Sequence, residues 1–226
     1  MASYCGPLVN TWSGLEKLNI FDKPYCKRLI SIMENDWEQT NNLQFNRTVL
    51  EAILTPNLTD RLRGFFGCNF IPQWMRWYKN DSIDPERPYA FYWHCDGGPR
   101  AHLKLLLYLN SSQVSGGNTL FLSREQTKAF EEIGYVFCNI DHRLSDLTPL
   151  SEKFMIGYDP IDYRPLSGDA ILFEPSRILH KGIWPKVRKR YMIQLLFIPS
   201  MLPWEEMKNL TDLPVESNAY PDLRNA

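Results

Sequence analysis

The sequence predicts a mainly β protein in which helices come first and antiparallel strands follow. Apolar residues recur at helical spacing within the first 70 residues, whereas later segments are short runs rich in aromatic and branched residues. The chain has 226 residues, of which 44% are hydrophobic, so it can bury one substantial core. We therefore expect a single domain over 1–226, with helical support over about 1–70, a β core over about 71–200 and a C-terminal extension over about 201–226.

The first part of the chain carries helix signals. Asp22 followed by Pro24 is typical of a helix start. Apolar residues then recur at helical spacing, at Leu29, Ile30, Met33 and Trp37. Two further helical stretches are expected, over 48–54 and 59–66.

The β pattern begins near residue 70. Its runs, separated by Gly, Pro, Asn and Asp, are QWMRWYK, AHLKLLLYLN, NTLFLS, DAILFEP and RYMIQLLFIP. Residues 124–165 break the pattern and are expected to hold a helix and a long insertion. Insertions of that length often form lids or binding loops, and the sequence leaves open whether this one does.

Composition excludes several classes of partner. The formal net charge is −1, so nothing indicates binding to nucleic acid or to an anionic membrane. The sequence has no apolar stretch of membrane-spanning length, and its first residues do not resemble a secretory signal. The five cysteines are scattered, which favours a reducing compartment. We expect a cytoplasmic protein that acts on a small molecule.

The most informative stretch is FYWHCDGGPR, residues 91–100. In an extended segment, His94 and Asp96 point the same way, so both can reach one ion. Alone, His-x-Asp is also common in polar turns. With His180, however, the chain offers two imidazoles and one carboxylate, the facial set that leaves three positions open on Fe(II) for a 2-oxo acid and O2. Arg190, ten residues after His180, offers a guanidinium for the distal carboxylate of such an acid.

The order of these motifs resembles the Fe(II)/2-oxoglutarate-dependent oxygenases, in particular the branch of prolyl hydroxylases and phytanoyl-CoA hydroxylase-like enzymes. The resemblance spans about residues 73–198 and rests on His94-x-Asp96, YLN (108–110), GGNTLFL (116–122), GDAILF (168–173), His180 and Arg190. It implies a double-stranded β-helix, or jelly roll, that uses Fe(II), 2-oxoglutarate and O2. It also implies site roles: His94, Asp96 and His180 as iron ligands, and Arg190, Tyr108 and Tyr78 as residues that bind 2-oxoglutarate.

Strand alternation predicts which other polar side chains lie near this site. Residues two apart share a face, so the inward face extends along the strands from Arg190, Tyr108 and Tyr78. The polar side chains added in this way, or by the Gly-Gly-Pro turn, are Gln194, Lys104, Arg76 and Arg100. We expect one of the three cationic members to bind an anionic group of the substrate.

The expected activity is hydroxylation of a C–H bond of a small molecule, such as an amino acid, an acyl derivative or a natural-product intermediate, with release of succinate and CO2. The carboxylate of Asp96 disfavours halogenation, because halogenases of the family lack it, while desaturation stays open. Two alternatives remain: a hydroxylase of protein side chains of the prolyl hydroxylase type, and a non-catalytic metal-containing jelly-roll module. The sequence does not indicate an oligomeric state.

Overall fold

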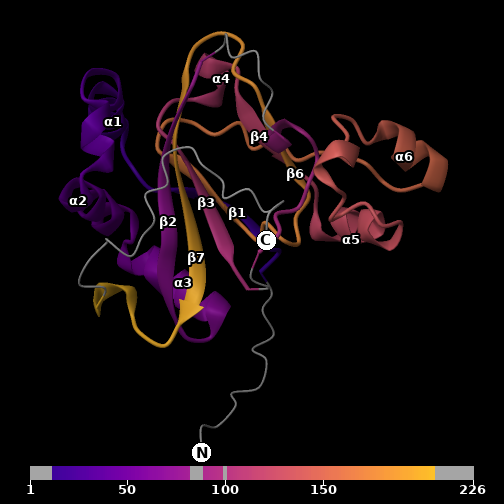
Figure 1. Ribbon diagram of the computed structural model, residues 1–226, viewed down its shortest axis with the longest axis horizontal. Helices are drawn as coiled ribbons and strands as arrows, with labels where there is room; N and C mark the ends of the chain where they lie inside the picture. Colours follow the sequence, from indigo (N-terminus) through magenta and orange to yellow (C-terminus); the bar gives the residue numbers. More distant parts are fainter. Residues whose placement is uncertain (1–11, 82–88, 99–100, 207–226) are drawn as a thin grey trace, which may run out of the picture.

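The computed structural model describes residues 12–81, 89–98 and 101–206, and they form mainly antiparallel sheet with several helices (Figure 1). The larger sheet has five strands in the order β1-β5-β3-β7-β2, and the smaller pairs β4 with β6. All of these pairings are antiparallel. The strands are β1 (Leu15–Asn19), β2 (Asn69–Asn80), β3 (Leu103–Tyr108), β4 (Asn118–Phe121), β5 (Asp169–Phe173), β6 (His180–Ile183) and β7 (Arg190–Ser200).

The α-helices among the described residues are α1 (Lys23–Asn35), α2 (Leu43–Ile53), α3 (Pro56–Phe66), α4 (Ser112–Ser115), α5 (Arg124–Glu132) and α6 (Thr148–Phe154). All of these except α6 begin after a residue whose side chain caps them. The side chains of Asp22, Asn42 and Thr55 accept hydrogen bonds from backbone amides at the starts of α1, α2 and α3. Among the described residues, no helix has the length and apolar composition that a membrane span requires.

The expected succession of helices and then strands is confirmed, with three corrections. Strand β1 precedes the helices and pairs with β5. It lies at a sheet edge, only Leu15 of its sequence LEKLN is buried, and it gives only a weak strand signal. Helix α2 begins at Leu43, five residues before the expected start, because Asn42 caps it. Helix α3 likewise begins at Pro56, three residues before the expected start, because Thr55 caps it. After the turn that follows β5, His180 opens strand β6.

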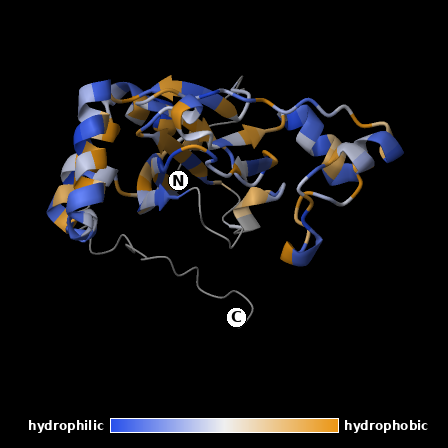
Figure 2. Ribbon diagram, turned by 90° about the horizontal axis from the view of Figure 1, so that it is seen from above, coloured by the Kyte–Doolittle hydropathy of each residue, from blue (hydrophilic) through white to orange (hydrophobic). Residues whose placement is uncertain are grey.

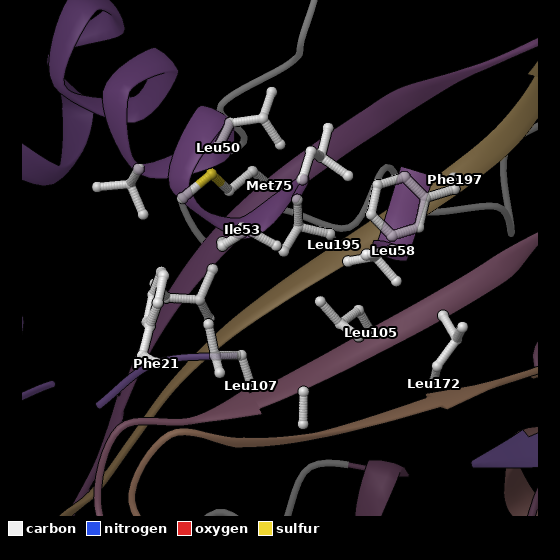
Figure 3. Close-up of a cluster of buried hydrophobic side chains, with 14 of the residues drawn as sticks. Phe21, Leu50, Ile53, Leu58, Met75, Leu105, Leu107, Leu172, Leu195 and Phe197 are labelled. Atoms are coloured by element: carbon white, nitrogen blue, oxygen red, sulfur yellow. The ribbon is translucent and has the colours of Figure 1, made fainter. Parts of the chain in front are cut away.

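Helices α1, α2 and α3 cover one face of the larger sheet (Figure 1). Coloured by hydropathy, the helices alternate hydrophilic and hydrophobic residues, as expected of helices with one buried face (Figure 2). Figure 3 shows the resulting core, in which helix residues Leu50, Ile53 and Leu58 lie against Leu105 and Leu195 of the sheet. The layer of α1, α2 and α3 therefore supports the larger sheet on one face.

The opposite face of the sheet packs against the smaller sheet. Leu106 and Tyr108 of β3, Met192 of β7 and Phe173 of β5 form a second buried cluster with Phe121 of β4. Since β3 is covered on both faces, all six of its residues are buried, which explains the uninterrupted apolar run within LKLLLY. The candidate site lies on this second face.

Residues 124–165 contain α5 and α6 and form a third cluster beside the smaller sheet. Phe130, Tyr135 and Leu147 from this region are buried together with Trp93 and Cys95. These last two residues flank His94 in the chain. The insertion therefore packs against the segment that carries His94 and Asp96.

One glycine is required where β5 begins. Gly168 has φ of +91°, and a Cβ at this position would lie 1.9 Å from the carbonyl oxygen of Phe21. Its amide donates to the Tyr108 carbonyl at 2.8 Å, while its own carbonyl accepts from the amide of Ile20 at 2.9 Å. Only glycine fits this turn, which joins β5 to the end of β3 and to the segment before α1.

Candidate metal centre

The structure brings His94, Asp96 and His180 together. Their ligand atoms all lie within 4.8 Å of one another. An antiparallel backbone bridge holds the two histidines side by side: the His94 amide donates to the His180 carbonyl at 3.1 Å, and the reverse hydrogen bond is 3.0 Å long. The Asp96 amide donates to the Pro175 carbonyl at 2.8 Å, which ties the third member to the turn after β5.

Local hydrogen bonds turn both imidazoles toward one point. The Nδ1 of His94 lies 2.7 Å from the Tyr92 carbonyl oxygen, and the Nδ1 of His180 lies 2.9 Å from that of Ile178. A carbonyl can only accept, so each Nδ1 is the protonated nitrogen and each Nε2 keeps its lone pair. These Nε2 atoms lie 3.4 and 3.6 Å from Oδ1 of Asp96. Two imidazole nitrogens and one carboxylate oxygen around one point fit a divalent iron site.

Asp96 is ionised and held by a cation. Burial alone would raise the pKa of Asp96, but the charge of the Lys104 ammonium outweighs it and holds the pKa well below its usual range. Lys104 contacts Oδ2 of Asp96, which leaves Oδ1 to face the histidines. Lys104 therefore lies at the site, as expected, but as the partner of Asp96. This contact also explains how β3 can bury a lysine.

Acid should destabilise the metal-free protein through His180. Burial and the neighbouring His94 lower the pKa of His180 to about 4, whereas an unfolded histidine titrates near 6.5. Between these values the unfolded chain binds more protons, so stability falls as pH falls through this window, by about 3 kcal/mol in total. In urea titrations at pH 7 and pH 4.5, wild type should lose about 3 kcal/mol more than His180→Gln. An equal loss in both proteins would contradict the expectation.

Arg190 is a buried guanidinium at the start of β7, with 6% of its surface exposed. It donates to the carbonyls of Asn118 (3.0 Å) and Ile183 (3.3 Å) and to Oδ1 of Asn80 (3.2 Å). Among the described residues, it makes no ion pair, and its Nε has no hydrogen-bond partner. A guanidinium has five N–H donors, so Nε–H and one Nη2–H remain for the two oxygens of a carboxylate.

The two tyrosines expected near the cosubstrate lie on the same face as Arg190. Burial lowers the pKa of Arg190, and Tyr108 and Tyr78 act in the opposite direction. The fully buried hydroxyl of Tyr108 donates to Oγ1 of Thr119 at 3.0 Å. Tyr78 lies opposite Met192 in the pairing of β2 with β7 and packs against the cluster between the sheets.

The remaining expected residues are Arg76, Gln194 and Arg100. Arg76 and Gln194 are cross-strand partners, two register positions from Tyr78 and Met192, and both are half-buried. The Arg76 guanidinium lies over the Trp74 ring, 4.8 Å from its centroid. Arg100 lies outside the described residues, as do residues 207–226 of the expected C-terminal extension.

The sequence did not reveal the residues that brace the His94 segment. The Tyr135 hydroxyl donates to the Trp93 carbonyl at 3.2 Å and accepts from the Leu144 amide at 2.7 Å. The Trp93 amide in turn donates to the Leu144 carbonyl at 2.9 Å. Tyr135 lies in the insertion over 124–165, which has no clear sequence pattern. The sequence gives no signal for its contacts, because its partners are backbone groups elsewhere in the chain.

Tyr135→Phe should destabilise the protein by about 1–3 kcal/mol, because it leaves the Leu144 amide without its acceptor. Iron affinity should also fall several-fold, because the segment before His94 loses a brace. Urea unfolding and iron titration would measure both effects. Tyr163→Phe is the matched control, since no hydrogen bond of its hydroxyl is found among the described residues. Equal effects of the two substitutions would contradict this role.

No protein-family model matches the sequence, and no curated protein matches it either. Solved structures do resemble the fold. EctD from S. alaskensis with bound Fe has a TM-score of 0.56 and 14% identity, over 83% of this chain and 73% of that one. The epimerase SnoN in complex with Fe3+, alpha ketoglutarate and nogalamycin RO has a TM-score of 0.56 and 9% identity, over 83% and 79% of the two chains. HygX from Streptomyces hygroscopicus with iron bound has a TM-score of 0.53 and 13% identity, over 84% of each chain.

At this identity the similarity establishes a shared fold. Neighbours of this fold have been crystallised with Fe and with 2-oxoglutarate, and the chain carries its own His94, Asp96 and His180 cluster. The fold and the cluster together therefore define a candidate metal position between antiparallel sheets.

Proposed function

We propose that this protein is a non-haem Fe(II)- and 2-oxoglutarate-dependent oxygenase. The observation that carries the proposal is the pairing of the His94, Asp96 and His180 cluster with Arg190, a buried cation that makes no ion pair among the described residues. A metal cluster alone would also suit a binding module. The guanidinium with unused donors adds a position for the second carboxylate of a 2-oxo diacid.

Each residue has a defined part in this proposal. His94, Asp96 and His180 hold the metal, which, with 2-oxoglutarate and O2, supplies the oxidising chemistry. Arg190 binds the distal carboxylate of 2-oxoglutarate, with Tyr108 and Tyr78 beside it. The Phe173 ring packs edge-on against His180 at 4.8 Å between centroids, and Phe121 stacks at 6.4 Å. These rings exclude water from one side of the metal position.

The proposed reaction is hydroxylation of a C–H bond of a small molecule, with release of succinate and CO2, in a cytoplasmic protein. Two structural neighbours support a small-molecule substrate: one is a complex with nogalamycin RO, and another is a complex with 2-oxoglutarate and 5-hydroxyectoine. The proposal includes a double-stranded β-helix in a single domain and membership of the prolyl hydroxylase and phytanoyl-CoA hydroxylase-like branch. Since the neighbour SnoN is an epimerase, inversion of the configuration at a C–H centre is the second candidate for the reaction.

The proposal is tested by 2-oxoglutarate turnover without added substrate. Oxygenases of this kind release succinate slowly under these conditions, whereas a binding module releases none. We expect succinate that requires both Fe(II) and O2 and disappears when either is withheld. If wild type binds iron and 2-oxoglutarate but forms no succinate, the protein is the non-catalytic module instead. Peptide and metabolite pools would then separate a protein hydroxylase from a small-molecule enzyme.

A further inference from the structure

A cavity of about 620 Å³ lies beside α5 and reaches Asp96 of the candidate metal centre. Asp96 and Gly98 of the metal-binding segment form part of its wall, and Arg124, Lys128 and Arg177 line the rest together with residues of the insertion. Its volume is typical of sites for small organic ligands. Because it reaches a proposed metal ligand, a molecule bound there would have one end next to the reacting position.

The charges of this cavity are mostly positive. Arg124 and Lys128 lie one turn apart on α5, and Arg177 follows strand β5. Arg124 is fixed by an ion pair with the buried Glu174, 2.9 Å away, which offsets its charge. Lys128 and Arg177 make no ion pair with another described residue. Two cations without an ion pair to another described residue, lining one cavity, favour an anion between them.

The other charged lining residues offset these cations only in part. Glu131 lies three residues after Lys128 on α5, at helical contact spacing, yet forms no ion pair with it. Asp96 is already paired with Lys104 and is assigned to the metal. The wall also has an apolar part, since Val136 and Phe137 line it and 62% of the surface of Phe137 is exposed.

From this arrangement we infer that the cavity beside α5 binds an organic acid, with its carboxylate or phosphate group between Lys128 and Arg177 and its apolar part against Phe137. This inference rests on the proposed function and names the substrate class of the same site. The sequence predicted that Arg76, Lys104 or Arg100 binds the anionic group of the substrate. This inference assigns that role instead to Lys128 on α5 and Arg177 in the turn after β5. Binding of a remote charged group would orient the reacting C–H bond toward the metal.

The test is anaerobic calorimetric titration of the protein loaded with Fe(II) and saturating 2-oxoglutarate. Three probes share a phenyl group: hippurate carries a carboxylate, phenyl phosphate carries a phosphate, and hippuramide is neutral. Wild type should bind at least one of the two acids and bind hippuramide more weakly. The acid that binds more tightly identifies the preferred anionic group.

The variant Lys128→Gln/Arg177→Gln should bind that acid about tenfold more weakly while its affinity for hippuramide stays unchanged. Phe137→Ala should weaken the acid and hippuramide alike. Lys27→Gln, an exposed lysine on α1, is the matched control and should leave all affinities unchanged. Both polar substitutions lie on exposed side chains, so folding should be retained.

The inference is overturned if neither acid binds wild type, if hippuramide binds as well as the acids, or if the double variant keeps wild-type affinity for them. The visible charge-transfer band of the iron chelate with 2-oxoglutarate, recorded on the same samples, separates this failure from that of the proposed function. If every variant shows the band and the double variant binds the acid as wild type does, only the inferred substrate class is wrong. No band in wild type removes the proposed function itself.

Discussion

His180→Ala should lower the affinity of the protein for Fe(II) by more than about 100-fold. Loss of a group that only orients a ligand already costs about 10–100-fold, and His180 is proposed as a ligand itself. The substitution leaves the backbone bridge to His94 possible, because that bridge uses amide and carbonyl groups. The charge-transfer band of the chelate with 2-oxoglutarate should vanish at iron concentrations that saturate wild type.

His142→Ala is the matched control for this experiment. His142 is exposed on a short 3₁₀ turn in the insertion, so it tests the loss of an imidazole away from the proposed centre. Its iron affinity and band should equal those of wild type. Should His180→Ala keep the band, the cluster of His94, Asp96 and His180 would not be the iron site.

Arg190→Met should raise the dissociation constant for 2-oxoglutarate by about 100- to 1,000-fold. Removing one partner of a buried ion pair costs about 3–5 kcal/mol, and each 1.4 kcal/mol is tenfold in affinity. Iron binding should be unaffected, because the Arg190 guanidinium is not among the clustered ligand groups. The measurement is titration of the charge-transfer band with 2-oxoglutarate at saturating Fe(II).

Two further variants complete this test. Arg190→Lys keeps a charge but loses the planar fork, so its dissociation constant should lie between those of wild type and Arg190→Met. Arg188→Met removes an exposed cation two residues away and should change nothing. An Arg190→Met protein that binds 2-oxoglutarate normally would show that the distal carboxylate lies elsewhere, even if iron still binds.

Local features of the fold were predictable because they depend on neighbours in the chain. Asp22 and Pro24 mark the start of α1, since a cap needs only a side chain and the next amides. The buried run within LKLLLY predicts a covered strand. Where the local pattern was weak, as in the half-exposed edge strand β1, the prediction failed.

The sequence by itself indicated that two candidate ligands, His94 and Asp96, lie on one side of the chain, because an extended backbone places the side chains of residues two apart on the same side. It also offered His180 and Arg190, but their place depends on sheet pairing over long separations. Only the tertiary structure decided that His180 bridges to His94, that Lys104 pairs with Asp96, and that Lys128 of α5 lines the same cavity as Asp96. The physical reason is that register and burial are fixed by packing between distant segments, which no local pattern records.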